Sequence, residues 1–529
     1  PSPHAERGGL ARVYHKIKEI RAVSKHSLLF NTGDTIQGSA EVLYTRGLAI
    51  TEILNHFGFD AFAPGNWDFV YGTKRFLELF SGPKPLAPWN AVAANLYFAD
   101  VQDVPDSPYP ELSGARVLPP YLLLNIGEVR VAVLGFTTER GPQALGPSAT
   151  HGFRFSGGDV EFAEFIPLLR SQASIVIAVS ELGLANNIRL AEAYPGIDVI
   201  LSSDMHEETR QAVTTKTGTV IVEEGQDGTV LGEMVLHIEE GKVKSVKWTQ
   251  HVIDETVPED PDIAELVRKV RAPFVSGPDF TPLPNPFNGS LLQRPIDSVI
   301  GYTEVALHRS NFSHSDMPAV IEGSSHDFLA DAFRHQCGAD IGAIRGFRYG
   351  THVKAGPIKL EDLYHFIPIG PQIASGMITG EQLKKQIEKS AHGSLSPEVN
   401  QWSGGWLFAY SGVTMELNPY AEKGSRAANI QIDNKPLQEA SEYRYASYWY
   451  SHEPEAVNLV PVKDLRVLKS DSGAPMDATE VVVRYLQGLP EQTVTPTFSR
   501  IKLTHALPEP QFGNPEIQPL RGARSLNQK

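Results

Sequence analysis

Three apolar stretches, VRVAVLGF at 129–136, SIVIAVS at 174–180 and DVILS at 198–202, decide the fold class of the chain. Each is short and rich in β-branched residues, and a segment long enough for a helix separates the last two. Helical patterns also begin at Leu10 and Leu48, on either side of a strand predicted at 27–31. This alternation predicts an α/β fold with a mostly parallel sheet between helical layers. We expect residues 219–223 and 232–238 to pair as closing antiparallel strands.

Length and proline content predict the domain organisation. A chain of 529 residues corresponds to about two to four domains. Asp260 and Pro261 predict the start of a helix that runs to about Arg271, because aspartate favours the cap and proline the first turn. Six prolines between 273 and 295 then exclude a helix or a central strand. We therefore divide the chain into a first domain at 1–254, a linker helix and proline-rich connection at 255–296, and a second α/β domain with an extended tail at 297–529.

The composition excludes several classes of function. The formal net charge of −15 opposes binding to a nucleic-acid polymer, because the phosphates would be repelled. The single cysteine, Cys337, excludes an intramolecular disulfide and a cysteine-rich zinc site. No apolar run approaches the roughly 20 residues that a membrane helix requires, so no membrane span is expected.

Polar side chains follow four of the predicted strands at their carboxyl ends. They are Asp34 after the strand at 27–31, Asn66 after a short strand predicted at 61–63, Glu181 after 174–180, and the pair Asp204 and His206 after 198–202. Ligands of open α/β sheets bind in the crevice at these strand ends, so we expect the side chains to converge there. Four oxygen donors and one nitrogen donor suit a divalent cation such as Mn, Mg, Ca or Fe(II). Taken singly, each residue also fits a turn, a helix cap, a solvated loop or a surface pair; their order along the strands favours a metal site.

The motifs around these residues resemble those of the 5′-nucleotidase superfamily of two-domain metallophosphoesterases. They read GGLAR at 8–12, GDT at 33–35, GNWDF at 65–69 and DMH at 204–206. Within that superfamily, GDTIQGS at 33–39, YTRG at 44–47 and WDFVYG at 67–72 are similar to SoxB-type thiosulfohydrolases. The resemblance implies a four-layer α/β/β/α metallophosphoesterase domain followed by a mixed α/β domain of the 5′-nucleotidase C-terminal type.

The resemblance also implies roles for the strand-end residues. Asp34 would bridge two divalent metals, with Asn66, Glu181 and Asp204 completing the second and His206 belonging to the first, beside an Asp-x-His pair that the sequence as given does not contain. One or two ions of Mn, Mg, Ca, Fe or Zn would lower the pKa of a bound water that attacks the substrate. Glu181 and Asp204 stand where the superfamily has histidines. Trp67 stands where the nucleotidases have a histidine, and an indole cannot donate a transferable proton.

The second half is expected to bind a small anionic substrate. Arg345 and Arg348 flank a Gly-Phe pair, and guanidinium groups suit anions. We predict Arg348 to act with Asp34 and Asn66 in catalysis, and Arg345, Trp406, Phe408 and Trp449 to bind substrate with it. The alternatives are surface ion pairs for the arginines and core packing for the aromatic rings.

Three functions remain open from the sequence. The first is a metal-dependent phosphoester hydrolase acting on nucleotides or similar anions. The second is a SoxB-like hydrolase of sulfur-linked groups, with a possible carrier protein as partner. The third is a binding protein with a degenerate catalytic site. Because members of the superfamily are usually exported, the resemblance implies a periplasmic or secreted protein.

Overall fold

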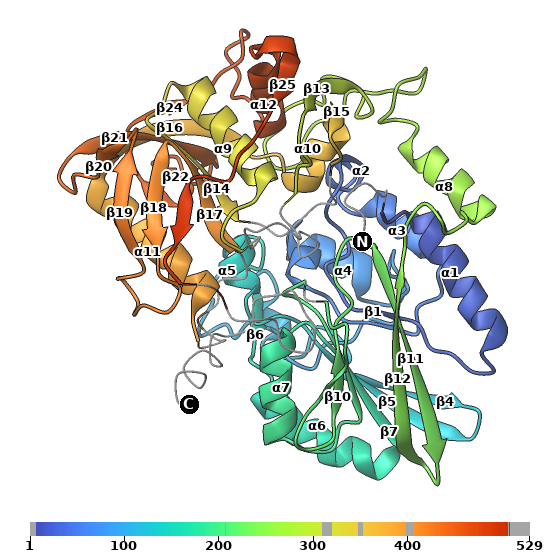
Figure 1. Ribbon diagram of the computed structural model, residues 1–529. Coiled ribbons are helices and arrows are strands. Elements are labelled where there is room, and N and C mark those ends of the chain that lie inside the picture. The colour runs from blue at the N-terminus through green and yellow to red at the C-terminus, as the bar shows by residue number, and fades with distance from the viewer. Residues whose placement is uncertain are drawn as a thin grey trace.

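The protein has two α/β halves joined by a linker helix (Figure 1). A computed structural model describes residues 7–206, 208–308, 320–346, 353–397, 401, 406–505 and 507. In Figure 1 the first half, from blue to green, lies below and to the right of the second half, from yellow to red. Among the described residues, none of the helices is both long and apolar enough to cross a membrane.

A six-stranded sheet with the order β4-β5-β7-β8-β10-β9 forms the centre of the first half. β5, β7, β8 and β10 run parallel, and β4 and β9 are antiparallel edges. The three decisive stretches are therefore neighbouring strands, as predicted. The strands of this sheet are β4 (Tyr121–Ile126), β5 (Val129–Phe136), β7 (Ile175–Ser180), β8 (Val199–Ser202), β9 (Val213–Thr214) and β10 (Val220–Val222).

The predicted pairing of residues 219–223 with 232–238 is wrong. β10 lies between β8 and β9 in the six-stranded sheet. β11 (Val230–Glu239) instead pairs with β12 (Lys242–Val252) as a long antiparallel ribbon. The residue pattern that predicts the two strands carries no information about which strands they pair with. The loop from β11 to β12 is shorter than the loop from β10 to β11, and such a tight hairpin favours pairing of β11 with β12.

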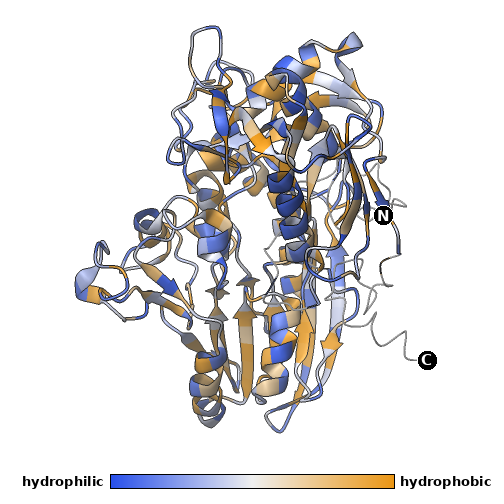
Figure 2. Ribbon diagram, turned by 90° about the vertical axis from the view of Figure 1, so that its left-hand side faces the viewer, coloured by the Kyte–Doolittle hydropathy of each residue, from blue (hydrophilic) through white to orange (hydrophobic). Residues whose placement is uncertain are grey.

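Four layers build the first half. One face of the six-stranded sheet packs on α6 (Asp159–Gln172) and α7 (Leu184–Ala193). The other face packs on the parallel pair β1–β2 and on the ribbon, through apolar side chains that include Ala61, Ile177 and Met234. A third cluster lies beneath the outer helices of that side. The predicted α/β/β/α order is confirmed, and Figure 2 shows the apolar strands between helices with hydrophilic outer faces. The remaining elements are α1 (Leu10–Val23), β1 (Phe30–Asn31), α2 (Ala40–Tyr44), α3 (Leu48–Leu54), β2 (Ala61–Phe62), η1 (Asn66–Phe69), α4 (Thr73–Phe80), β3 (Leu96–Phe98), η2 (Pro110–Leu112), α5 (Gly141–Leu145) and β6 (Phe153–Phe155).

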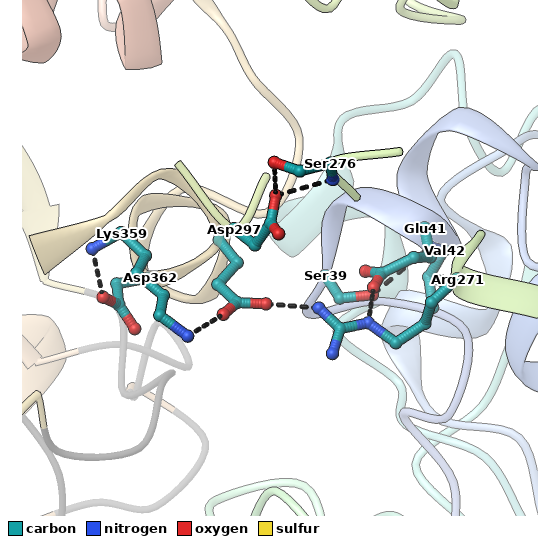
Figure 3. Close-up of polar contacts among 9 residues, drawn as sticks. Ser39, Glu41, Val42, Arg271, Ser276, Asp297, Lys359 and Asp362 are labelled. Carbon is teal, nitrogen blue, oxygen red and sulfur yellow. Dashed lines mark hydrogen bonds and ion pairs between the residues drawn. The ribbon is translucent and has the colours of Figure 1, made fainter. Parts of the chain in front are cut away.

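The linker helix α8 (Pro261–Arg271) connects the halves through its last residue. It begins as predicted, because the Asp260 side chain accepts hydrogen bonds from the first backbone N–H groups of the helix. Arg271 Nε donates to Glu41 Oε1 of the first half at 2.7 Å, and its other arm pairs with Glu361 of the second half. Figure 3 shows Arg271 beside Glu41, with Asp297 and Lys359 nearby. A single guanidinium thus pairs with one carboxylate from each half.

The second half contains a five-stranded sheet, a four-stranded sheet and a three-stranded sheet within its described residues. Two apolar clusters fill it, and one of them also takes in Ala40 and Leu43 of the first half. β25 and β26 belong to these sheets, so the chain continues in regular structure past residue 489, where only a surface tail was expected. The limits predicted for the domains stay a prediction. The elements are β13 (Val299–Thr303), α9 (Ser324–Cys337), β14 (Ile341–Gly346), β15 (Gly356–Lys359), α10 (Leu360–Phe366), β16 (Gln372–Thr379), α11 (Gly380–Leu395), β17 (Trp406–Ser411), β18 (Val413–Leu417), β19 (Ala427–Ile432), β20 (Lys435–Pro436), β21 (Glu442–Trp449), β22 (Ala456–Val457), β23 (Val460–Pro461), β24 (Lys463–Val467), α12 (Ala478–Gln487), η4 (Pro490–Gln492), β25 (Thr493–Val494) and β26 (Ile501–Leu503).

Asp477 fixes the linker against the second half. Its carboxylate caps α12 through Thr479 N at 3.0 Å and also accepts a hydrogen bond from Ser290 Oγ of the linker at 3.1 Å. Burial raises the pKa of Asp477 to about 6, from an ordinary value of 3.8. Between these two values the folded chain binds more protons at this site than the unfolded chain. The contribution of Asp477 to the free energy of unfolding therefore falls as pH rises from about 4 to about 6.

Replacing Asp477 with Asn removes this titration. We expect the free energy of unfolding of Asp477→Asn, relative to the wild type, to increase by up to about 3 kcal/mol between pH 4 and pH 7. Urea unfolding followed by circular dichroism at several pH values measures the difference. Asp471→Asn, at a side chain that is 98% exposed, is the control. A difference that stays constant with pH would contradict the raised pKa.

Candidate functional site

Two tight turns bring the Asp34 and Asn66 segments into contact. Gly33 has a φ of 101°, and Asp34 follows it with a φ of 54°. A Cβ at Gly33 would lie only 2.6 Å from Gly65 N and 2.7 Å from Ala63 O. Glycine is therefore required at position 33 both for the backbone conformation and for the close approach. This requirement explains why the Gly-Asp motif follows β1 directly.

The buried carboxylate of Asp68 holds these two segments together. Its Oδ1 accepts hydrogen bonds from Thr35 N at 2.9 Å and from Ile36 N at 3.2 Å, and its Oδ2 accepts one from Gly65 N at 2.8 Å. In return, Trp67 N donates to Asp34 Oδ1 at 2.8 Å. Burial, together with the negative charge of Asp34, raises the pKa of Asp68 to about 7. Asp68 belongs to the GNWDF motif, but the sequence alone did not indicate that it positions the backbone of the two turns.

Glu181 adds a second buried acid beside Asp34. It follows β7 and is 1% exposed. Burial is the largest cause that raises the pKa of Glu181, and the charges of Asp34 and Asp68 raise it further. Within the described residues, Glu181 Oε2 is buried and has no hydrogen-bond partner. A cation beside this oxygen would stabilise the charged carboxylate, and would therefore lower the pKa that burial and the neighbouring acids raise.

His206 also lies near Asp34. The distance from His206 Nε2 to Asp34 Oδ2 is 3.8 Å, and both side chains are 12% exposed. The other ring nitrogen, Nδ1, lies 3.1 Å from Gln226 Oε1. An amide oxygen can only accept a hydrogen bond, so this contact requires the proton on Nδ1. Gln226 was not predicted from the sequence. It lies in the loop after β10, so a search for polar residues after the next predicted strand along the chain would have found it.

Asp204 is held by an arginine that the sequence did not indicate. The guanidinium of Arg140 forms an ion pair with the carboxylate of Asp204, and the two side chains are 16% and 6% exposed. Arg140 Nη2 also lies 3.0 Å from Met205 Sδ. Asn66 is buried at the start of η1. Its two chain neighbours donate their backbone N–H groups to the acids, Gly65 to Asp68 and Trp67 to Asp34. The roles predicted for Asn66 and Asp204 stay predictions.

The donor set fits a cation in part. In the described part of the chain, no three His, Cys, Asp or Glu side chains stand in an arrangement that could hold a metal ion. Asp34 and His206 lie 3.8 Å apart, and the buried oxygen of Glu181 that has no hydrogen-bond partner among the described residues is the atom whose chemistry calls for a cation. These donors, with Asn66, suit one hard or borderline divalent ion. The carboxylate of Asp204, by contrast, is paired through Oδ2 with the guanidinium of Arg140.

The predicted substrate residues of the second half lie in different surroundings. Trp406 is 4% exposed within an apolar cluster, and its burial agrees with the alternative of core packing. Phe408 and Trp449 are half-buried at the edge of the same cluster. Arg345 lies near Tyr450, whose raised pKa its charge partly offsets. Arg348 lies outside the described residues. Substrate binding by these residues stays a prediction.

Comparison with known proteins confirms the predicted fold and the predicted superfamily resemblance. Residues 299–455 match the family "5′-nucleotidase, C-terminal domain". The chain is 24% identical to the trifunctional nucleotide phosphoesterase protein YfkN of Bacillus subtilis, over 82% of this chain but 29% of that protein. It is 23% identical to the snake venom 5′-nucleotidase of Crotalus adamanteus, over 80% of this chain and 71% of that one.

Two solved structures, both from Thermus thermophilus, share the architecture of both halves. The sulfate thiohydrolase SoxB, in complex with glycerol, superposes with a TM-score of 0.76 at 20% identity, over 94% of this chain and 84% of that chain. A 5′-nucleotidase precursor from the same organism gives a TM-score of 0.74 at 19% identity, over 94% of each chain. At these identities the similarity establishes the fold.

Removing the Asp68 carboxylate is expected to separate the two turns. Asp68→Ala would leave three backbone N–H groups without their acceptor, so we expect the free energy of unfolding to fall by about 3 kcal/mol or more. Asp60→Ala, which removes a carboxylate that accepts from the single N–H of Leu29, should cost about 1 kcal/mol. Urea unfolding of both variants provides the measurement. Equal losses in the two variants would contradict the role assigned to Asp68.

Proposed function

We propose that the chain is a metal-dependent hydrolase that cleaves phosphoester bonds of nucleotides or similar small anions. The observation that carries this proposal is the group of acidic side chains around Asp34, at the carboxyl edge of the sheets. Asp34 faces His206 at 3.8 Å, and the neighbouring Glu181 keeps a buried oxygen with no hydrogen-bond partner among the described residues. The similarity to nucleotide phosphoesterases and 5′-nucleotidases supports the reaction class.

Asp34, Asn66, Glu181 and His206 are the residues that would hold a divalent cation. When bound, such a cation supplies positive charge at the substrate oxygens and an acidified water as nucleophile. The chain itself holds two of these donors, Asp34 and His206, in place. The N–H of Trp67 holds Asp34 Oδ1, and Gln226 holds His206 Nδ1, which leaves Nε2 turned toward Asp34. Because these two side chains are held by hydrogen bonds, they need less reorganisation than free side chains when the charge develops.

Trp67 gives the site an apolar wall at the position where the nucleotidases have a histidine. Its ring packs with Val70 and with Ile369 of the second half. An indole on this wall excludes water but transfers no proton to a leaving group. We therefore infer that substrates with good leaving groups, such as aryl phosphates, react faster than nucleoside monophosphates.

We further infer that the protein acts outside the cytoplasm. The snake venom relatives and the 5′-nucleotidase precursor support this location by their names. Fractionation of the source cells, with antibody detection, tests it.

Asp34→Ala tests the proposed function directly. We expect the variant to lose bound metal and to lower kcat/KM for an aryl phosphate by at least about a hundredfold, the scale on which loss of a charge-stabilising group acts. Elemental analysis and steady-state kinetics provide the two readouts. Asp159→Ala, which removes an exposed carboxylate paired with Arg189 and hydrogen-bonded to Tyr194, is the control and should retain both properties. An active Asp34→Ala variant with full metal content would overturn the proposal.

A further inference from the structure

Arg140 lies at the end of the loop that joins β5 to α5. It comes four residues after Phe136 and directly precedes Gly141. Its guanidinium reaches across the edge of the sheet to the loop that follows β8, where it pairs with Asp204. A Cβ placed on Gly183 would lie 3.5 Å from Asp204 Oδ2 and 3.9 Å from Arg140 Nη2. The ion pair therefore lies over the loop that follows β7, two residues beyond Glu181.

The charges at this edge explain why an arginine is tolerated there. The superfamily pattern has histidines at positions 181 and 204, and this chain has two acids instead. Replacing two neutral imidazoles with two carboxylates adds two negative charges at this edge, and one of them, Glu181, lies beside Asp34 and Asp68. A buried carboxylate needs a charged or hydrogen-bonding partner. Glu181 has an oxygen without one among the described residues, whereas Asp204 is paired with Arg140.

A guanidinium and a divalent cation compete for the same oxygens. The arm of Arg140 is directed at Asp204 Oδ2, so a cation bound to that oxygen would lie against a fixed positive charge. The guanidinium side chain stays charged at all physiological pH values, so this repulsion is permanent. Arg140 also has planar N–H groups that can bind an anionic oxygen in pairs.

We propose that Arg140 takes the place of the second metal ion. It withdraws Asp204 from the metal-binding set and supplies a fixed positive charge for the anionic group of the substrate. The site then combines one cation, held among Asp34, Asn66, Glu181 and His206, with one guanidinium. This inference rests on the proposed function for its first cation, but concerns a residue that the metal-binding pattern does not include.

Manganese uptake by four forms of the full chain tests the proposal. Equilibrium dialysis against Mn²⁺, followed by elemental analysis, gives the number of ions per chain for the wild type, Asp204→Asn, Arg140→Ala and the double variant. We expect Asp204→Asn to match the wild type, because Asp204 is not a ligand. We expect Arg140→Ala to gain about one ion, because Asp204 is released, and the double variant to lose that gain. Arg189→Gln, at an exposed ion pair, should leave uptake unchanged.

Two results would overturn the proposal. One is a lower Mn²⁺ content in Asp204→Asn than in the wild type, which would make Asp204 a ligand. The other is an Arg140→Ala variant that folds, by circular dichroism, and gains no ion. If Arg140→Ala fails to fold, the comparison of Asp204→Asn with the wild type and the uptake of Arg140→Lys, which should equal the wild type, decide the question. A wild-type chain without hydrolase activity would refute the proposed function and leave these metal comparisons intact.

Discussion

The site of this protein depends on a single buried carboxylate that accepts three backbone hydrogen bonds. Asp68 joins the turn after β1 to the turn after β2, and it lets the backbone at Gly33 and Gly65 approach more closely than any side chain would allow. Burying a charge is costly unless it is hydrogen-bonded, and here the backbone supplies the compensation. Asp34 is oriented by this same junction, through the N–H of Trp67. The position of the central acid is thus set by main-chain geometry.

An excess of negative charge is the second constraint. Burial and neighbouring acids raise the pKa values of Asp68 and Glu181, and burial with the charge of Glu223 raises the pKa of Glu224 to about 7. So many acids at one edge of a sheet oppose one another unless positive charge is brought to them. Arg140 is one source of that charge within the chain. The cation proposed above would be the other source, so the donor chemistry and the charge balance lead to the same proposal.

Much of the fold was predictable from local sequence, whereas the environment of the site was only partly so. The strand at 129–136 and the start of the linker helix at Pro261 agree with the sequence because periodicity and capping act within a few residues. The partner of β11 was not predictable, since alternation identifies a strand but not its neighbour. Arg140 and Gln226 were missed for a related reason. Their roles arise from contacts with residues 64 and 20 positions away, and neither belongs to a motif.

The apolar contacts between the halves have a consequence for handling the protein. Trp67 packs against Ile369, and Ala40 and Leu43 join the core of the second half. A first-half fragment without the linker helix would expose these apolar side chains to water, together with a Glu41 carboxylate that has lost its ion pair with Arg271. We expect such a fragment to self-associate, so the first half cannot be studied as an autonomous module without redesigning that surface.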